Sequence, residues 1–181
     1  KQVAGMMKDT FARLGCRPSL ERSIQISADG TALSFYTPQT GYVFMDHLRA
    51  ICCLGEFMRG ADVAVEESSP WALTALARQY GRRVLRYSPA GEGDEGARKL
   101  AEEQPFLRDG MMMAVYLLSF LKEHEVSLEE ALRLIPDFYT VRRFVAVPPA
   151  GSHQYRDKQG QVTVKPVKSG KGVWVLAEGE K

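Results

Sequence analysis

Hydrophobic positions between Ala61 and Ser88 follow a strand spacing, then a helix spacing, then a strand spacing again. The apolar run Val63–Val65 precedes a helical pattern with an apolar face over residues 71–80, and a second apolar run follows. Strand, helix and strand in so short a stretch predict a βαβ unit, which implies parallel strands with a helix laid over them. The helix is expected to begin with Trp71 on its apolar face.

Upstream of this unit, the pattern predicts a helix, a β-hairpin and a second helix. Residues 1–15 recur at helical spacing, whereas Ile24–Ile26 and Ala32–Tyr36 alternate as half-buried strands do. Asp46 is the expected N-cap of a helix over residues 47–58, because its carboxylate can accept from free backbone N–H groups.

Downstream, three further helices are predicted from their capping residues. Asp94 begins a polar helix, Asp109 begins the most apolar helix of the chain, and Ser127 with Glu130 forms a capping box. The apolar helix is nonpolar nearly all round, so we expect it to be buried between the sheet and another layer. Its methionines Met111–Met113 indicate either an adaptable binding surface or plain core packing, and we favour packing.

The composition changes near residue 148. A strand predicted over 139–147 leads into a segment rich in glycine and lysine, with strand-like runs at Val162–Val164 and Val173–Leu176. This segment is expected to be a small β-rich appendage. The predicted fold class is therefore α/β, with a mixed sheet in αβα layers and this appendage at the C-terminal end.

Composition and charge are those of an ordinary globular protein: 181 residues, 45% hydrophobic, 25% charged and a net charge of +2. So small a charge gives no argument for nucleic acid or a membrane surface as partner. The longest apolar run, Met111–Leu121, is shorter than the roughly 20 residues of a membrane span. Cys16, Cys52 and Cys53 lack metal-ligand spacing and are expected to be inert thiols, as in a reducing cytoplasm.

The order of several short phrases resembles the α-D-phosphohexomutase family, which includes phosphomannomutase and phosphoglucomutase. After the βαβ unit come Arg108-Asp109-Gly110 with an apolar helix, then Leu128–Leu132, Ile135-Pro136 and Val141–Arg143. The resemblance runs from about residue 20 to 147 and is greatest to the third domain of the family. It implies that residues 1–60 end a domain-two-like unit, 61–147 form an αβα domain-three-like unit, and 148–181 are a truncated domain-four-like segment.

The resemblance also implies where the catalytic loops should lie. The family's magnesium loop, Asp-x-Asp-x-Asp-Arg, corresponds to Ser27–Ala32, where Asp29 is the one acidic residue. Mg²⁺ needs charged oxygen ligands to offset its dehydration. Asp29 is therefore a weak remnant of a metal ligand at most, and we favour reading Asp29-Gly30 as a β-turn pair.

The other loops are altered or missing. The sugar loop Gly-Glu-x-Ser-Gly is absent between Tyr87 and Asp109, where Gly91–Gly93 is a fragmentary echo, and Ala177–Lys181 replaces the phosphate loop Arg-Pro-Ser-Gly-Thr. The phosphorylated serine belongs to the first domain of the family, which this chain does not contain. No catalytic residue and no metal site are predicted, and the residues that bind sugar phosphate are unknown.

Three functions stay open at this point. The chain is expected to be a catalytically degenerate module, structural or sensing a hexose phosphate, like the mutase-like modules fused to sugar-phosphate nucleotidyltransferases. Alternatively, it is part of an active Mg²⁺-dependent hexose-phosphate mutase, an intramolecular phosphotransferase whose serine loop lies elsewhere. A purely structural interaction domain is the third possibility. The expected partners are a hexose phosphate and upstream nucleotidyltransferase or mutase domains, with no cofactor bound by this chain and no nucleic acid or membrane.

Overall fold

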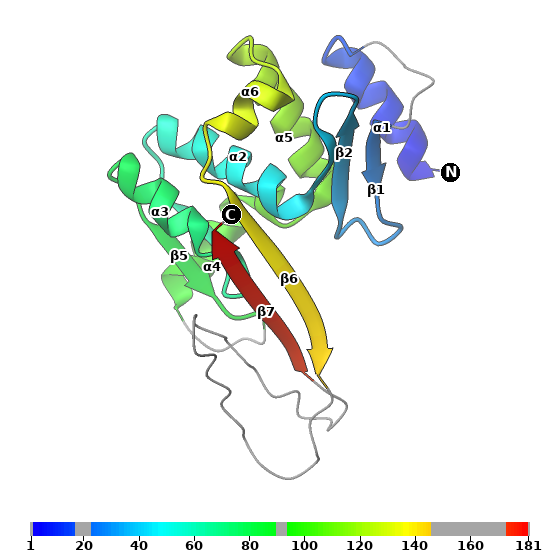
Figure 1. Ribbon diagram of the computed structural model, residues 1–181. Coiled ribbons are helices and arrows are strands. Elements are labelled where there is room, and N and C mark those ends of the chain that lie inside the picture. The colour runs from blue at the N-terminus through cyan, green and yellow to red at the C-terminus, as the bar shows by residue number, and fades with distance from the viewer. Residues whose placement is uncertain (1, 17–22, 90–93, 146–172, 181) are drawn as a thin grey trace. The chain divides into compact units, whose positions relative to one another are not determined.

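The chain forms two compact units in a computed structural model that describes residues 2–16, 23–89, 94–145 and 173–180 (Figure 1). The larger unit comprises Lys1–Glu67 and Leu73–Pro136, and the smaller unit comprises Ser68–Ala72 and Asp137–Lys181. The helices and strands of the larger unit are α1 (Gln2–Arg13), β1 (Ile24–Ile26), β2 (Leu33–Thr37), β3 (Gly41–Phe44), α2 (Met45–Met58), β4 (Val63–Glu66), α3 (Ala72–Gln79, entering this unit at Leu73), β5 (Val84–Tyr87), α4 (Glu95–Glu103), the 3₁₀ turn η1 (Pro105–Leu107), α5 (Gly110–Glu123) and α6 (Leu128–Arg133).

The first sheet is antiparallel, in the order β1-β2-β3. Ile24 pairs with Phe35, which confirms the predicted hairpin, and Phe35 in turn pairs with Val43 on the unpredicted strand β3. Leu33, Phe35 and Val43 are buried, so one face of the sheet packs against the core and the other is open.

The second sheet confirms the predicted βαβ unit. β4 and β5 are parallel, with Val63 opposite Val84 and Glu66 opposite Tyr87. The predicted apolar face of α3 is confirmed at Leu73, Leu76 and Ala77, which are buried. The prediction for Trp71 is wrong, because the helix begins one residue later and the Trp71 side chain is 46% exposed.

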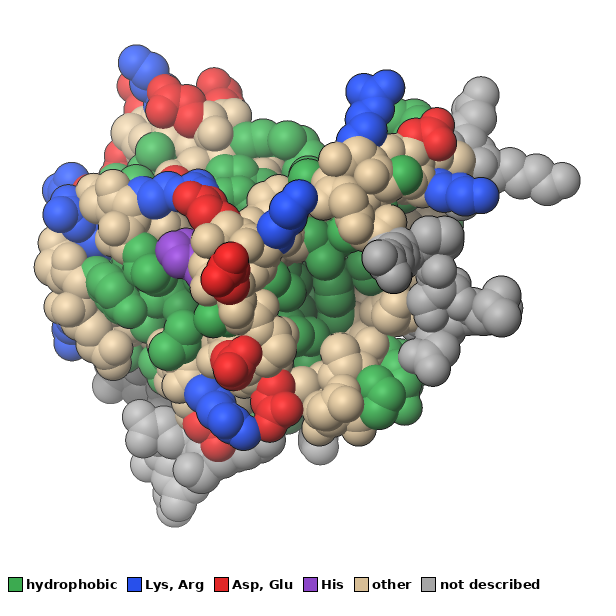
Figure 2. Space-filling model, turned by 90° about the horizontal axis from the view of Figure 1, so that it is seen from above, with side chains coloured by type: hydrophobic (Ala, Val, Ile, Leu, Met, Phe, Trp, Pro, Cys, Tyr) green, Lys and Arg blue, Asp and Glu red, His purple; other side chains and the backbone are tan. Residues whose placement is uncertain are grey.

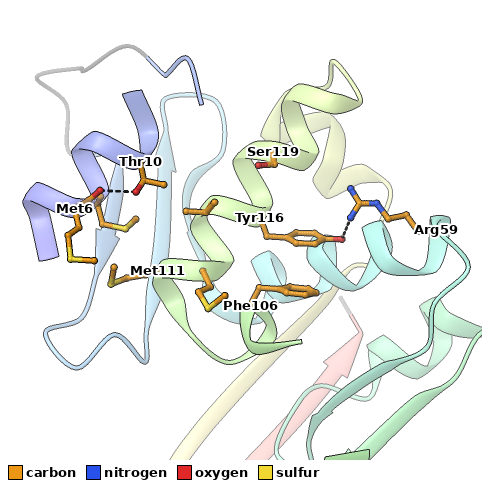
Figure 3. Close-up of a pocket in the computed structure, with 10 residues that line it drawn as sticks. Met6, Thr10, Arg59, Phe106, Met111, Tyr116 and Ser119 are labelled. Carbon is orange, nitrogen blue, oxygen red and sulfur yellow. Dashed lines mark hydrogen bonds between the residues drawn. The ribbon is translucent and has the colours of Figure 1, made fainter. Parts of the chain in front are cut away.

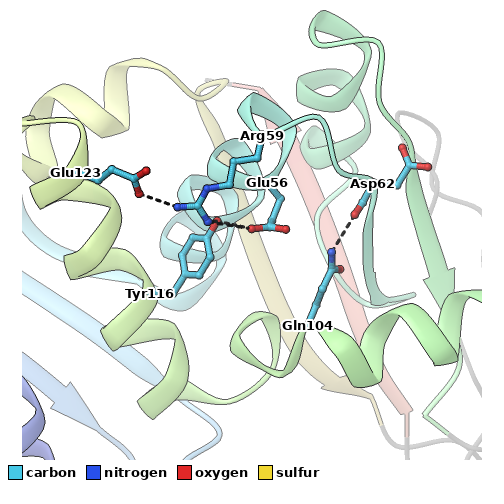
Figure 4. A network of polar contacts seen from close by, with 6 residues as sticks. All are labelled: Glu56, Arg59, Asp62, Gln104, Tyr116 and Glu123. Atoms are coloured by element: carbon cyan, nitrogen blue, oxygen red, sulfur yellow. Dashed lines mark hydrogen bonds and ion pairs between the residues drawn. The ribbon is translucent and has the colours of Figure 1, made fainter.

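The other edge of β4 is occupied by a side chain instead of a strand. The side-chain oxygen of Gln104 accepts from the Ala64 N–H at 3.0 Å. Its side-chain nitrogen donates to the Asp62 carbonyl at 2.9 Å, the bond drawn in Figure 4. Both backbone groups would otherwise need partners, because an unpaired buried peptide group is costly. The Gln104 side chain therefore makes the hydrogen bonds at this edge of β4 that a neighbouring strand would otherwise make.

The core lies between α2 and α5, with α4 covering the parallel sheet. Its largest fully buried side chains include Leu48, Ile51, Leu54, Met113, Leu117 and Phe120. Cys52 and Cys53 are both fully buried, and burial raises the pKa of both thiols, that of Cys53 to about 12. These two thiols are thus protonated core residues, as predicted.

Helix boundaries confirm most of the predicted caps and correct one. Asp94 and Asp109 accept from the first N–H groups of α4 and α5, and Ser127 and Glu130 form the capping box of α6. Asp46 is not a cap. Helix α2 starts earlier, its N-cap Phe44 has no side-chain bond, and Asp46 lies in the first turn, where it pairs with Arg49 at 3.0 Å.

Helix α5 is less enclosed than its sequence predicts. Gly110, Met113, Ala114, Leu117 and Phe120 are buried. Met112, however, is 46% exposed, so burial on all sides is wrong for this helix. One side of α5 is left open although its side chains are apolar.

Among the described residues of the smaller unit, β6 (Phe138–Val145) and β7 (Val173–Glu180) form an antiparallel pair. Phe138 pairs with Glu180 and Val145 with Val173. The two predicted strands are confirmed, and β7 continues through Ala177–Glu180, whereas Val162–Val164 lies outside the described residues.

The α/β class is confirmed, with the described strands divided over three small sheets. The domain boundaries at 60 and 147 stay predictions. Acidic and basic side chains are interspersed with hydrophobic ones on the face shown in Figure 2. In the part of the chain that the structure describes, no helix is both long and apolar enough to cross a membrane.

Replacing Gln104 by Ala should lower the free energy of unfolding by about 1–3 kcal/mol, because Ala64 N–H and the Asp62 carbonyl lose their partner. Gln79→Ala, at an exposed position of α3, is the matched control and should change it by less than about 0.5 kcal/mol. Urea denaturation of both variants measures the difference, and equal midpoints would contradict the role given to Gln104.

Candidate functional site

The carboxyl ends of β4 and β5 bring acidic, basic and phenolic groups together. Ligands of open α/β sheets commonly bind outside the carboxyl ends of parallel strands. Glu66 and Tyr87 are the last residues of these strands and pair with each other across the sheet. Tyr87 is 7% exposed, and burial, followed by the Glu66 carboxylate, raises its pKa. The positive charge of Arg108, its hydrogen bond to Tyr87 and the positive charge of Arg49 lower this pKa in part.

Arg49 is the fixed cation of this group. Its Nε donates to the Leu107 carbonyl at 2.8 Å, and its Nη1 donates to Asp46 Oδ1 at 3.0 Å. Its side chain is 12% exposed, so the ion pair lies in a poorly solvated position between α2 and η1. Arg108, by contrast, is exposed, in the short segment between η1 and α5.

The loop between β1 and β2 is closed by its own side chains. Ser27 Oγ donates to Asp29 Oδ1 at 2.5 Å, and the same oxygen accepts from the Thr31 N–H at 3.1 Å. The Ala32 N–H donates to Ser27 Oγ at 2.8 Å, and Gly30 has a φ of +73°, which a glycine adopts without strain. Asp29 therefore acts as a turn residue.

This loop lies against the start of α5. The Gly110 N–H donates to the Gly30 carbonyl at 2.8 Å, which satisfies one of the N–H groups that a helix start leaves free. A Cβ on Gly110 would lie 2.9 Å from the Gly30 oxygen and 3.1 Å from the Ala32 oxygen. Glycine is required here because the two backbones approach so closely.

The Mg²⁺ ion of the phosphohexomutases does not fit this loop. One Asp29 oxygen is occupied by Ser27 and Thr31, and the neighbouring Asp109 uses its Oδ1 to accept the Met112 N–H at 2.8 Å. Among the residues that the structure describes, no group of three or more His, Cys, Asp or Glu side chains is placed to hold a metal ion. Mg²⁺ prefers several charged oxygen ligands, and here each of the two carboxylates already has one oxygen bonded within the protein.

The sequence predicted part of this site. It identified Asp29 and Asp109 separately, and the structure brings their loops together through Gly30 and Gly110. Residues 91–93 lie outside the described residues, and Ala177–Glu180 belongs to β7. Sequence reasoning missed Glu66 and Tyr87, although their position at the ends of two predicted parallel strands was the available signal.

Solved structures resemble this chain in fold. A protein from Thermus thermophilus assigned as a phosphomannomutase matches with a TM-score of 0.54 and 16% identity, covering 96% of this chain and 46% of that one. An N-acetylglucosamine-phosphate mutase in its substrate complex matches with a TM-score of 0.56 and 11% identity, covering 92% and 48%. The N-acetylphosphoglucosamine mutase of Aspergillus fumigatus matches with a TM-score of 0.54 and 10% identity, covering 96% and 48%.

The chain thus has the fold seen in the α-D-phosphohexomutase superfamily, which confirms the resemblance found in the sequence. At these identities the match concerns the fold alone, and the chain spans about half the length of the mutases it matches. No protein-family model matches the sequence, and no curated protein matches it either.

Replacing Ser27 by Ala should raise the pKa of Asp29 toward the ordinary value of 3.8. The Ser27 hydroxyl is the largest cause that holds this pKa at about 2 in the folded protein, and the Thr31 N–H is the next. Because the folded-state pKa is depressed, the stabilisation from ionised Asp29 is complete above about pH 4 and is lost as the pH falls through about 2. A carboxyl-carbon NMR titration measures the shift, with Ser34→Ala on β2 as control. An unchanged Asp29 midpoint in Ser27→Ala would contradict the turn geometry.

Replacing Gly110 by Ala should destabilise the protein by about 1–3 kcal/mol, because backbone oxygens must move to admit the methyl group. Gly5→Ala is the matched control, since Gly5 also lies in a helix and has nothing within 4 Å of its Cβ position. That control should be neutral or stabilising by up to about 1 kcal/mol. Thermal unfolding separates the two, and equal melting temperatures would disprove the close approach of α5 to the loop.

Proposed function

We propose that this chain is a catalytically degenerate phosphohexomutase-like module of carbohydrate metabolism that binds a hexose phosphate without converting it. The observation that carries the proposal is the state of Asp29. Its carboxylate is tied by Ser27 and Thr31 in the loop where the family resemblance places three metal-binding carboxylates. The loop is used for folding, so a Mg²⁺-dependent phosphoryl transfer has no metal site there.

Ligand binding is supported by the groups at the carboxyl ends of β4 and β5. The exposed guanidinium of Arg108 can donate to phosphate oxygens in a forked geometry. Glu66 adds an acceptor for sugar hydroxyls, and Tyr87 adds a hydroxyl that is both donor and acceptor. Arg49 contributes positive charge from a fixed position but is already bonded to Asp46 and Leu107.

The proposal includes a setting for the module. Degenerate modules of this kind resemble those fused behind sugar-phosphate nucleotidyltransferases, so an upstream nucleotidyltransferase or mutase domain in the cytoplasm is the proposed partner. Binding of hexose phosphate here would report the level of substrate or product to that domain.

The alternative is part of an active Mg²⁺-dependent hexose-phosphate mutase. The observation that favours this alternative is length: the chain spans about half the length of the mutases that share its fold. A serine loop and further ligands would then come from outside this chain. The two proposals differ in their dependence on metal.

Calorimetric titration with glucose 1-phosphate and mannose 6-phosphate tests the binding proposal. We expect binding of at least one of them that is unchanged by a chelator of Mg²⁺. Arg108→Gln should weaken it by about tenfold or more, through the loss of one charged hydrogen bond. Arg78→Gln, an exposed arginine on α3, is the charge-matched control and should leave affinity unchanged. No heat with any hexose phosphate would favour a purely structural domain.

A coupled assay for interconversion of hexose 6- and 1-phosphates, with Mg²⁺ and the full-length protein, tests the alternative. The degenerate module predicts no turnover, and Asp29→Asn should change no Mg²⁺-dependent property because Asn keeps the oxygen that accepts from Thr31. Turnover that Asp29→Asn abolishes would establish the active mutase instead.

A further inference from the structure

A cavity lies on the open side of α5, where Met112 is exposed. It has a volume of about 410 Å³ and is lined from α1, α5, η1 and the residue that follows α2 (Figure 3). Pockets for small molecules usually have volumes of about 300–1,000 Å³ and are mostly apolar with a few polar groups. This cavity lies at the small end of that range.

Four of the chain's seven methionines line it: Met6, Met7, Met111 and Met112. Met7 is 7% exposed, whereas Met6 is 62% and Met112 46% exposed. Thioether side chains are flexible and polarizable, so they adapt to a ligand and make favourable contacts with aromatic rings. Their exposure means that apolar surface stays in contact with water while the cavity is empty.

The cavity is held in place at two points. Lys122 Nζ donates to the Leu14 carbonyl at 2.9 Å, which ties the C-terminal end of α1 to α5. At the second point, Phe106 and Tyr116 stack with ring centroids 4.2 Å apart and planes 8° apart (Figure 3). Gly55 allows this position of Tyr116, because a Cβ there would lie 2.8 Å from the tyrosine oxygen.

The charges at the cavity are compensated within the protein. Arg59 Nη2 donates to Glu123 Oε2 at 2.7 Å, and Arg59 Nη1 lies 3.5 Å from Glu56 Oε1 (Figure 4). Tyr116 donates to the same Glu56 oxygen at 2.6 Å, and burial, followed by this carboxylate, raises the pKa of Tyr116. One guanidinium facing two carboxylates does not attract an anion.

We propose that the cavity between α1 and α5 binds a neutral, mainly apolar small molecule that contains a flat ring. The ring would contact the methionines and the stacked pair of Phe106 and Tyr116, all of which line the cavity. The Ser119 hydroxyl at the same surface offers one hydrogen bond to a polar group of the ligand. A hexose phosphate is the wrong ligand here, both for its charge and for its hydroxyls, so the ligand proposed for this cavity differs from the one proposed for the strand ends.

Methyl-carbon-13 methionine NMR with N-phenyl-1-naphthylamine as the neutral aromatic probe tests the proposal. The methyl signals of Met6, Met7, Met111 and Met112 should shift on titration, and those of Met45 and Met58, which do not line the cavity, should not. Shifts confined to Met45 or Met58, or no shift at all, would overturn the proposal. The sulfonated, anionic probe 8-anilinonaphthalene-1-sulfonate should bind at least about tenfold more weakly, and equal binding would overturn the assignment of a neutral ligand.

Met112→Gln and Leu134→Gln form a matched pair, since both side chains are about half exposed and only Met112 lines the cavity. Met112→Gln should reduce probe affinity by about tenfold and leave thermal stability nearly unchanged, whereas Leu134→Gln should leave the affinity unchanged. Equal affinity of the two variants would disprove binding at this cavity.

Spectra recorded over a range of protein concentrations without probe serve as a further check. Concentration-dependent shifts of the four methionine methyls would assign the surface to a second copy of the chain and overturn the small-molecule proposal.

Discussion

The hydrogen bond from the Gly110 N–H to the Gly30 carbonyl is the contact on which both candidate sites depend. It joins a loop between two strands to the first residue of a helix 80 positions later in the chain. Because α5 starts at this bond, the bond determines where Arg108 and Asp109 lie just before the helix and where Met111 and Met112 lie in its first turn. The absence of a Cβ on Gly110 is what permits so close an approach.

Asp29 has a structural role in the loop that makes this contact with α5. Asp29 is fully exposed to water, and its ionised form is satisfied by a hydroxyl and a backbone N–H within the turn. Its pKa is lowered by hydrogen bonds to the charged form, chiefly from the Ser27 hydroxyl and the Thr31 N–H. A carboxylate used in this way orders the loop that presents the Gly30 carbonyl to α5. Metal binding would require these bonds to be exchanged for ion contacts.

Structural features that depend on residues close together in the sequence could be predicted, whereas those that depend on contacts between distant segments could not. The caps Asp109 and Ser127 and the βαβ unit follow from spacings of a few residues, and all three are present. Asp46 has an equally good capping residue type, but it pairs with Arg49 because α2 begins at Met45. Of the candidate site, the sequence identified Asp29 and offered a signal for Glu66 and Tyr87 at the ends of two predicted strands. The approach of Tyr87 to Arg108 and Arg49 was not predictable, since it requires the packing of β5, η1 and α2.

The prediction that α5 is buried on all sides is wrong at the side of the helix that lines the cavity. Its sequence is apolar on nearly every side, and a fully enclosed helix was the natural expectation. The structure encloses Met113, Leu117 and Phe120 but leaves Met112 about half exposed beside a cavity of about 410 Å³. Apolar surface of this kind is unfavourable in water in proportion to its area. A neutral apolar ligand would remove that surface from water without disturbing Arg59, whose charge is already matched by Glu56 and Glu123. Of the three consecutive methionines, Met113 is fully buried in the core, whereas Met111 and Met112 line the cavity and are the two that the proposed ligand would contact.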